Sequence, residues 1–279
     1  MSVTVTKNIA YGSHERHVFD LYMPQMPKTD SGIILFIHGG GWTSCDKTAH
    51  TKDCEYWSEK GYICGTMNYR YVDNRLTVFD ELDDITAAME KIKSVCAEQG
   101  RNPSRALLSG GSAGAHLSLM YAYIKADEAP ITPTAVFCHC PPTHCHKNDF
   151  LLGIGGEFEE WKYGVLSCCC GTTVSKKILN RADVQESLLR MSPVSYITDR
   201  VVPTGICHGV QDELVPYEHT LLFLKALEQN GIPHDLLTYP NSGHAMDKDP
   251  ELDTQAKDLM EQYLEKYLMK LSEQCGGIS

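Results

Sequence analysis

The sequence lacks any long apolar run. No stretch approaches the 18 or so consecutive apolar residues that a membrane-spanning helix needs, and the first 20 residues contain no apolar core of a secretory signal. Basic residues are also scarce, since 25 Lys and Arg stand against 36 Asp and Glu and give a net charge of −11. A nucleic-acid backbone or an anionic membrane surface would repel such a chain. We therefore expect a soluble, cytoplasmic protein with no nucleic-acid partner and no membrane partner.

Repeats, low-complexity tracts and Gly/Ser-rich linkers are missing too, so nothing in the sequence marks a domain boundary. The hydrophobic fraction of 42% and the charged fraction of 22% are ordinary for globular proteins and exclude a disordered or fibrous chain. A chain of 279 residues is long for one domain, but single α/β domains of this size are common. We expect one domain over residues 1–279, in a monomer or a homodimer.

Cysteine is plentiful, yet no two cysteines have the CxxC spacing of a zinc finger. Cys64, Cys138 and Cys207 lie inside apolar runs, where a free cysteine behaves as a small hydrophobic residue. Others form two dense clusters, at residues 138–146 and 168–170, which we interpret as core and loop thiols. We predict reduced cysteines, no bound metal and no cofactor.

Short apolar runs alternate with longer amphipathic stretches along the chain. The runs are mostly bounded by glycine or proline and predict buried strands, at residues 17–23, 32–37, 62–69, 105–109, 135–140, 204–208 and 235–239. Between them, apolar residues recur at steps of three and four from Ile85 to Cys96 and from Ala256 to Leu271, as on the buried face of a helix. This alternation predicts an α/β fold with a mostly parallel central sheet and helices on both faces. Such sheets hold their sites at the carboxyl ends of the strands.

One segment, at about residues 141–191, interrupts the alternation. It shows no clear strand and contains aromatic residues, glycines within residues 153–156 and the cysteines of residues 168–170. A loop of this length is uncommon inside a compact domain and is usually functional. We predict a short cap or lid insertion of small helices that folds over the mouth of the site.

The pattern Gly-x-Ser-x-Gly occurs at residues 110–114 and is centred on Ser112. It follows an apolar strand and precedes a stretch compatible with a helix, which is the context of a nucleophile elbow. Small residues are needed there because larger side chains would clash in so sharp a turn. The bare pattern is expected by chance roughly 0.1 times in such a chain, so the strand–turn–helix context carries the prediction. The alternative is that Ser112 only caps a helix.

Three consecutive glycines follow His38, directly after the apolar run at residues 32–37. Glycine frees the backbone to direct neighbouring N–H groups at one point, as an oxyanion hole requires. A phosphate-binding loop is the alternative, but neither GxGxxG nor GxxxxGK[ST] occurs. We expect the N–H groups of Gly40, Gly41 and Ala113 to form an oxyanion hole, with His38 bracing the glycine loop.

Two further residues complete the pattern. Asp212 lies just beyond one apolar run, and His244 lies in a loop after the last one. Singly, each is as readily a surface acid or a turn residue, but together with the two motifs they indicate nucleophilic catalysis. In that interpretation His244 takes the proton of Ser112, Asp212 orients the imidazole, and the serine attacks a carbonyl carbon.

The motifs HGGGW, GGSAGAHL, HGVQDELVP and NSGHAM together resemble those of the α/β-hydrolase superfamily. Within it, they resemble HGGG-type esterases such as acetylesterases and feruloyl-esterase-like (BD-FAE-like) carboxylesterases. The resemblance extends from Asp20 to the last helix and implies the α/β-hydrolase fold, with the order Ser, Asp, His in the chain. Gly111 departs from the hormone-sensitive-lipase pattern, which has Asp before the nucleophile.

The resemblance implies a serine carboxylic-ester hydrolase that works through an acyl-enzyme. We expect short acyl esters, acetyl esters above all, as small-molecule substrates, with acylated carbohydrates among them. Trp42 is expected to contact the substrate as a wall of the acyl site, although a plain packing role fits equally well. The insertion holds too few apolar residues to predict a long acyl tunnel, namely Phe150, Leu151, Leu152, Ile154, Phe158 and Trp161.

Three other functions stay open at this point. An arylformamidase-like amidase uses a related glycine loop, and a dipeptidyl-peptidase-like hydrolase shares the order of the three residues. A ligand receptor without catalysis occurs on the same fold when the histidine is missing. The presence of His244 disfavours the receptor, and a fluorophosphonate probe would label an enzyme but not a receptor.

Overall fold

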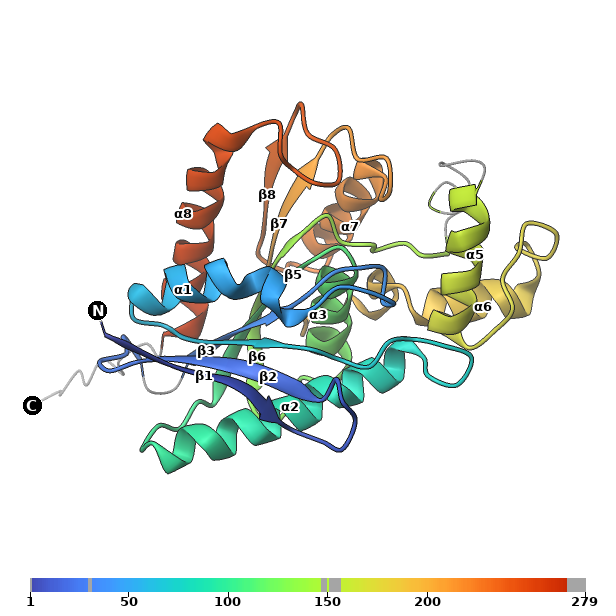
Figure 1. The fold of residues 1–279 in the computed structure, drawn as a ribbon. Helices are drawn as coiled ribbons and strands as arrows, with labels where there is room; N and C mark the ends of the chain where they lie inside the picture. Colours follow the sequence, from blue (N-terminus) through green and yellow to red (C-terminus); the bar gives the residue numbers. More distant parts are fainter. Residues whose placement is uncertain (1, 30–31, 147–149, 151–156, 270–279) are drawn as a thin grey trace, which may run out of the picture.

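Eight strands form one sheet through the centre of the protein (Figure 1). The structure, a computed structural model, describes residues 2–29, 32–146, 150 and 157–269. The strands lie in the order β1-β2-β4-β3-β5-β6-β7-β8, and pairing is antiparallel for β1–β2 and β2–β4 and parallel elsewhere. Their bounds are β1 Val3–Ala10, β2 Val18–Pro24, β3 Gly32–Ile37, β4 Ile63–Met67, β5 Arg105–Gly111, β6 Thr132–His139, β7 Thr204–Gly209 and β8 His234–Tyr239.

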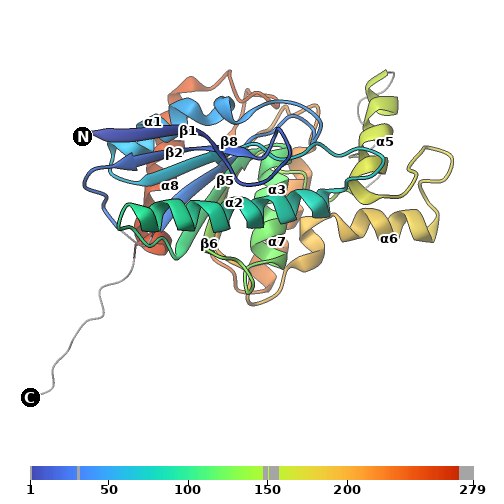
Figure 2. The same cartoon turned by 60° about the horizontal axis from the view of Figure 1, so that its bottom comes forward.

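Helices cover both faces of this sheet (Figure 2). Helices α1 (Thr51–Glu59) and α8 (Asp253–Tyr263) pack on one face, and α2 (Val78–Glu98), α3 (Ala113–Ile124) and α7 (Tyr217–Gln229) pack on the other. Short 3-10 turns occur at Lys47–His50, Pro193–Tyr196 and Pro250–Leu252, and a π-helical turn at Leu264–Leu268 follows α8. None of the described helices is long and apolar enough to cross a lipid bilayer.

The central strand β3 explains why the apolar runs in the sequence are unbroken. Successive side chains of a strand point to opposite faces, so Ile33 and Leu35 join the cluster under α2 and α3. Ile34 and Phe36 join the second cluster, under α1 and α8. Both faces are covered, so every position of β3 is apolar apart from its first glycine. The prediction of a mostly parallel sheet in an α/β-hydrolase fold is confirmed.

The sequence prediction missed β1. This strand lies at the edge of the sheet and is mostly exposed, so it carries polar residues where a central strand carries apolar ones. The other seven strands lie within a few residues of their predicted bounds. The predicted helix from Ile85 to Cys96 is the buried face of α2, whereas Leu271 lies outside the described residues.

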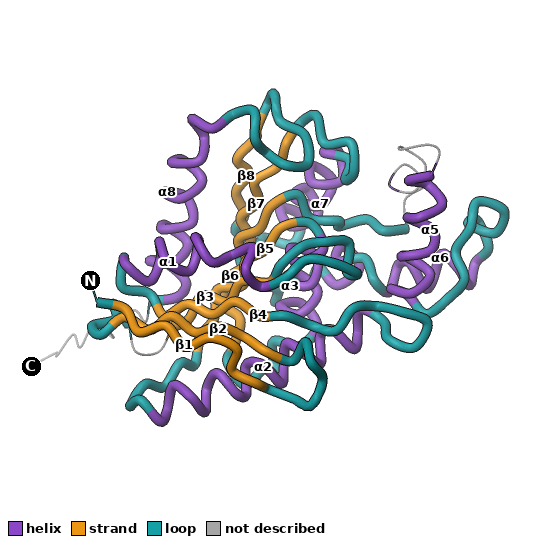
Figure 3. The backbone as a smooth tube through the Cα atoms, in the orientation of Figure 1, coloured by secondary structure: helices purple, strands orange, loops and turns teal. Residues whose placement is uncertain are grey.

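Helices α5 (Glu157–Cys170) and α6 (Ala182–Arg190) lie beyond the carboxyl ends of the strands, beside the sheet (Figure 3). These two helices lie within the segment predicted as a cap, which is called the cap below, but its role as a cap or lid stays a prediction. Residues 153–156 lie outside the described part. The cysteines at 168–170 are not loop thiols as expected, because they form the last turn of α5, with Cys169 buried. Cys64, Cys138 and Cys207 are buried in strands, as predicted.

Candidate active site

Ser112 occupies the sharp turn between β5 and α3. Its backbone has φ 54° and ψ −120°, a left-handed conformation that costs a non-glycine residue about 1–3 kcal/mol. A Cβ atom on Gly110 or Gly114 would lie 2.3 or 2.0 Å from the carbonyl oxygen of Ile37 in β3. The two glycines are therefore required because the backbone of β3 passes directly against the turn. The sequence-predicted elbow is present, and Ser112 lines a cavity.

The glycine loop is held by its carbonyl groups. The Gly39 oxygen accepts hydrogen bonds from His38 Nδ1 at 2.7 Å and from the Tyr69 hydroxyl at 3.2 Å. The Gly40 oxygen accepts from the Thr43 N–H at 3.2 Å and from a serine hydroxyl at 2.7 Å. In a trans peptide the N–H points opposite to the carbonyl. The hydrogen bonds to the Gly39 and Gly40 carbonyls therefore point the N–H groups of Gly40 and Gly41 in the opposite direction. Within the described part of the chain, neither N–H group donates a hydrogen bond.

His38 is the centre of this support. The Arg16 guanidinium, which can only donate, contacts His38 Nε2 at 3.1 Å, so the ring hydrogen is on Nδ1 and is donated to Gly39. Arg16 also donates from Nε to the Tyr69 carbonyl at 2.7 Å, and the Tyr69 ring stacks on His38 at 4.3 Å. The bracing role predicted for His38 is confirmed. Arg16 and Tyr69 carry no signal in the sequence that would have identified them.

Asp212 and His244 form a close pair at the carboxyl ends of β7 and β8. His244 donates from Nδ1 to Asp212 Oδ2 at 2.7 Å, which leaves Nε2 of the neutral ring as an acceptor. The other carboxylate oxygen of Asp212 accepts from the N–H groups of Leu214 and Val215, both at 2.8 Å. The neighbouring Glu213 is exposed. The structure therefore places the predicted acid and histidine together.

A second histidine, His208, was missed by the sequence prediction. It is fully buried and donates from Nε2 to Asp212 Oδ2 at 3.1 Å, while its Nδ1 accepts from Thr220 at 2.7 Å. Burial acts to raise the pKa of Asp212, but the hydrogen bonds from His208 and His244 outweigh it and hold that pKa below its ordinary value. Asp212 is therefore a carboxylate at neutral pH. In the sequence, His208 could have been found as a partner of Asp212 from its position four residues earlier in the same motif.

Trp42 links the glycine loop to the elbow helix and the cap. Its indole N–H donates to His116 Nδ1 at 3.2 Å, and His116 donates from Nε2 to the Met191 carbonyl at 2.7 Å. Trp42 is 5% exposed and lines the cavity. Its packing role is therefore present, and its contact with a substrate stays a prediction. Its indole N–H is used in the contact with His116, whose ring it meets edge-on at 5.1 Å.

The cavity has a volume of about 760 Å³ and lies between the strand ends and the cap. Ser112, His244 and the three loop glycines line one side, and Phe150, Trp161, Val165 and Leu166 line the other. Both Ser112 and His244 are described, and their side chains form no hydrogen bond with each other in this structure. Such contacts are often long without substrate. The tip of the Trp161 ring lies so near Gly41 that a Cβ there would be 2.8 Å away.

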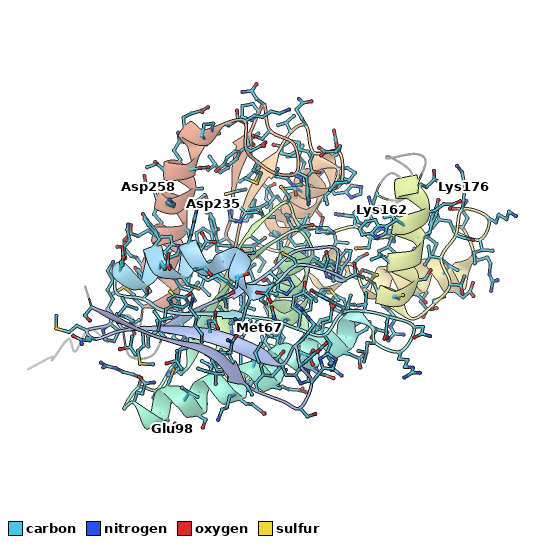
Figure 4. All side chains as sticks on the ribbon, in the orientation of Figure 1. Met67, Glu98, Lys162, Lys176, Asp235 and Asp258 are labelled. Atoms are coloured by element: carbon cyan, nitrogen blue, oxygen red, sulfur yellow. The ribbon has the colours of Figure 1, made fainter. Side chains whose placement is uncertain are left out.

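Lys162 connects the cap to the loop that carries Asp212. Figure 4 shows its side chain on the side of α5 that faces the sheet, whereas Lys176 lies on the far side. The Lys162 ammonium donates to the Leu214 carbonyl at 2.8 Å and lies 3.9 Å from the centre of the Phe150 ring. Three of the apolar residues counted for the acyl tunnel, Leu151, Leu152 and Ile154, lie outside the described part of the chain. No side chain is described for Phe158.

We expect the protein to lose stability as pH falls from 6.5 to about 4. Burial lowers the pKa of His38 and of His116 from 6.5 to about 4, so in this range only the unfolded chain is protonated at these rings. The unfolded state then binds more protons, and the free energy of unfolding falls with falling pH, by roughly 3 kcal/mol for each histidine. Above pH 6.5 this contribution is complete.

Urea unfolding at several pH values between 4 and 7 measures this effect. In H116Q, the glutamine keeps one donor for Met191 and one acceptor for Trp42 but does not titrate, so the stability should depend less steeply on pH, by the roughly 3 kcal/mol that His116 contributes. The exposed His14 offers the matched control H14Q, which should keep the wild-type slope. Parallel curves for H116Q and the wild type would contradict the assignment.

Comparison with known proteins identifies the family of this chain. A family model described as BD-FAE matches residues 19–227. The chain belongs to the BD-FAE family. Among curated proteins, this family member is similar to the probable carboxylic ester hydrolase LipM of Mycobacterium tuberculosis, with 28% identity over 86% of the chain and 56% of LipM. The chain spans about half the length of the curated relatives it matches.

Solved structures place the BD-FAE member among proteins of the α/β-hydrolase fold. It superposes on the propionate-bound esterase Est2 of Thermogutta terrifontis with a TM-score of 0.70 and 23% identity, over 92% of this chain and 93% of Est2. A truncated carbohydrate esterase from gut microbiota gives a TM-score of 0.69 and 18% identity, over 93% of this chain and 96% of that one. At these identities the likeness concerns the fold alone.

Proposed function

We propose that the protein is a serine esterase that hydrolyses carboxylic esters of small molecules. One observation carries the proposal. Ser112 on its strained turn, the Asp212–His244 pair and the anchored glycine loop all meet at a single cavity. A nucleophile, a base with an orienting carboxylate, and N–H donors without acceptors are the three parts that acyl transfer needs. The names of the relatives support the same class of reaction.

The mechanism assigns one role to each group. His244 Nε2 takes the proton of Ser112 as the hydroxyl oxygen attacks the ester carbonyl, and Asp212 stabilises the resulting imidazolium. The N–H groups of Gly40, Gly41 and Ala113 hold the oxyanion, each contributing about 3 kcal/mol to the transition state in comparable sites. The imidazolium returns its proton to the leaving alcohol, and water, activated in the same way, releases the acid from the acyl-enzyme.

The substrates we propose are short acyl esters, with acetyl esters first and acylated carbohydrates among them. The bound propionate of Est2 and the carbohydrate esterase with the same fold support this choice. The cavity of about 760 Å³ has to hold the alcohol part as well as the acyl part, and Trp161 and Leu166 line it from the cap. No cofactor takes part, and cytoplasmic location stays part of the proposal.

A chain-length series tests the substrate class. Among p-nitrophenyl esters from C2 to C16, we expect kcat/KM to be highest at C2 to C4 and to fall steeply by C10, since the described part of the cap gives the cavity few apolar side chains, among them Phe150, Trp161, Val165 and Leu166. Acetylated xylo-oligosaccharides should release acetate. A C12 optimum, or activation on emulsified triglyceride, would contradict the short-chain assignment and favour a lipase. Formylated arylamines and dipeptide amides in the same panel test the amidase and peptidase alternatives.

A further inference from the structure

A cysteine lies beside the Asp212–His244 pair. Cys140 follows β6 directly, is 2% exposed and lines the cavity. Its sulfur, a carboxylate oxygen of Asp212 and a ring nitrogen of His244 all lie within 4.8 Å of one another. No step of the ester hydrolysis uses this thiol. The three side chains follow three different strands, because Cys140 comes after β6, Asp212 after β7 and His244 after β8.

Thiolate, imidazole and carboxylate are the ligands that zinc and its heavier congener cadmium take in proteins. Two ligands of one tetrahedral zinc ion lie roughly 3.3–3.8 Å apart, given bond lengths of about 2.0–2.3 Å. Three atoms within 4.8 Å of one another therefore need side-chain movements of only about 1 Å to reach this geometry. The cavity that Cys140 and His244 both line is the route of entry.

Electrostatics favour a cation at this place. The Asp212 side chain is 0% exposed and carries a negative charge, so a divalent ion beside it gains attraction in a site of low dielectric. Burial raises the pKa of the Cys140 thiol, which therefore stays protonated without a metal. A coordinating cation displaces that proton and forms the metal–thiolate bond, with one proton released to solvent.

We propose that Cys140, Asp212 and His244 form a three-ligand site for a soft divalent cation, and that zinc or cadmium bound there inhibits the enzyme. Either ring nitrogen of His244 gives the same result. A metal on Nδ1 breaks the hydrogen bond to Asp212, and a metal on Nε2 removes the lone pair that accepts the proton of Ser112. The inhibition rests on the proposed ester hydrolysis, whereas the binding of the metal does not.

The first experiment measures hydrolysis of p-nitrophenyl acetate by the full chain, freed of metal with EDTA and dialysed. Zinc and cadmium should inhibit with one ion per chain and EDTA should restore the rate, whereas magnesium, which prefers oxygen ligands, should have no effect. In C140S the hydroxyl stays protonated and is a poor ligand. The concentration that halves each variant's own rate should rise at least 10-fold, because even outer-shell changes cost about 10–100-fold in metal affinity.

The exposed Cys45 provides the matched control, since C45S removes a thiol near the glycine loop but leaves the three ligands intact. Half-inhibition should be unchanged in C45S. Equal sensitivity of C140S and the wild type would place the inhibitory ion elsewhere and overturn the proposal. If C140S does not fold, C140A and the direct binding measurement below decide the question.

Direct binding separates the site from the proposed function. In S112A the three ligands are intact, so cadmium should produce the ultraviolet charge-transfer band of a cadmium–thiolate bond, and the band should be absent in the double variant S112A/C140S. A missing band in S112A overturns the metal site. A band in a protein that hydrolyses no ester supports the metal site and refutes the esterase proposal instead.

Discussion

S112A should lose essentially all ester hydrolysis, by about 10⁴-fold or more, as in other enzymes that lose the nucleophile of such a group. The substitution removes one hydroxyl at the rim of a cavity, so the fold and the cavity should remain. The φ of 54° at this residue strains alanine as much as serine, and the thermal midpoint should therefore change little.

Steady-state kinetics with p-nitrophenyl acetate measure the loss of hydrolysis. A fluorophosphonate probe measures whether the side chain at position 112 still reacts. The wild type should be labelled and S112A should not, which also decides against a receptor without catalysis. Circular dichroism serves as the control for folding. Retention of a tenth of the wild-type rate in folded S112A would refute Ser112 as the nucleophile.

D212N should cost roughly 10³–10⁴-fold in kcat, the loss typical when the acid that orients a catalytic histidine becomes an amide. The carboxylate of Asp212 accepts four hydrogen bonds, from His208, His244 and two backbone N–H groups. An amide has only one acceptor atom, so its NH₂ group must face at least one of these donors. The imidazole of His244 then loses its tautomer and its orientation.

The adjacent Glu213 supplies the control. Its side chain is exposed and takes no part in this network, so E213Q should keep its activity to within about twofold, as surface substitutions usually do. Kinetics on the two purified variants compare them directly. The opposite ranking, with E213Q the more damaged, would mean that the acid in the sequence motif had been assigned one position too early.

The order of the strands explains why most of the site could be predicted. The elbow, the glycine loop, Asp212 and His244 each follow a strand within a few residues, so local sequence identifies them. In a parallel sheet all such ends lie at one edge, and these short motifs therefore converge whatever the details of packing. The prediction failed for β1, because an exposed edge strand has no apolar pattern to reveal it.

The α/β class, the positions of the buried strands and the residues that meet at their carboxyl ends could thus be predicted from the residues alone, since burial and sharp turns select residue types locally. The side chains that support these residues became known from the folded chain. The contacts of Arg16 with His38, of His208 with Asp212, and of Cys140 with the Asp212–His244 pair depend on which strands and loops become neighbours. A lone arginine, histidine or cysteine has no local pattern of its own, because its partner is chosen by packing across the sheet rather than by its neighbours in the chain.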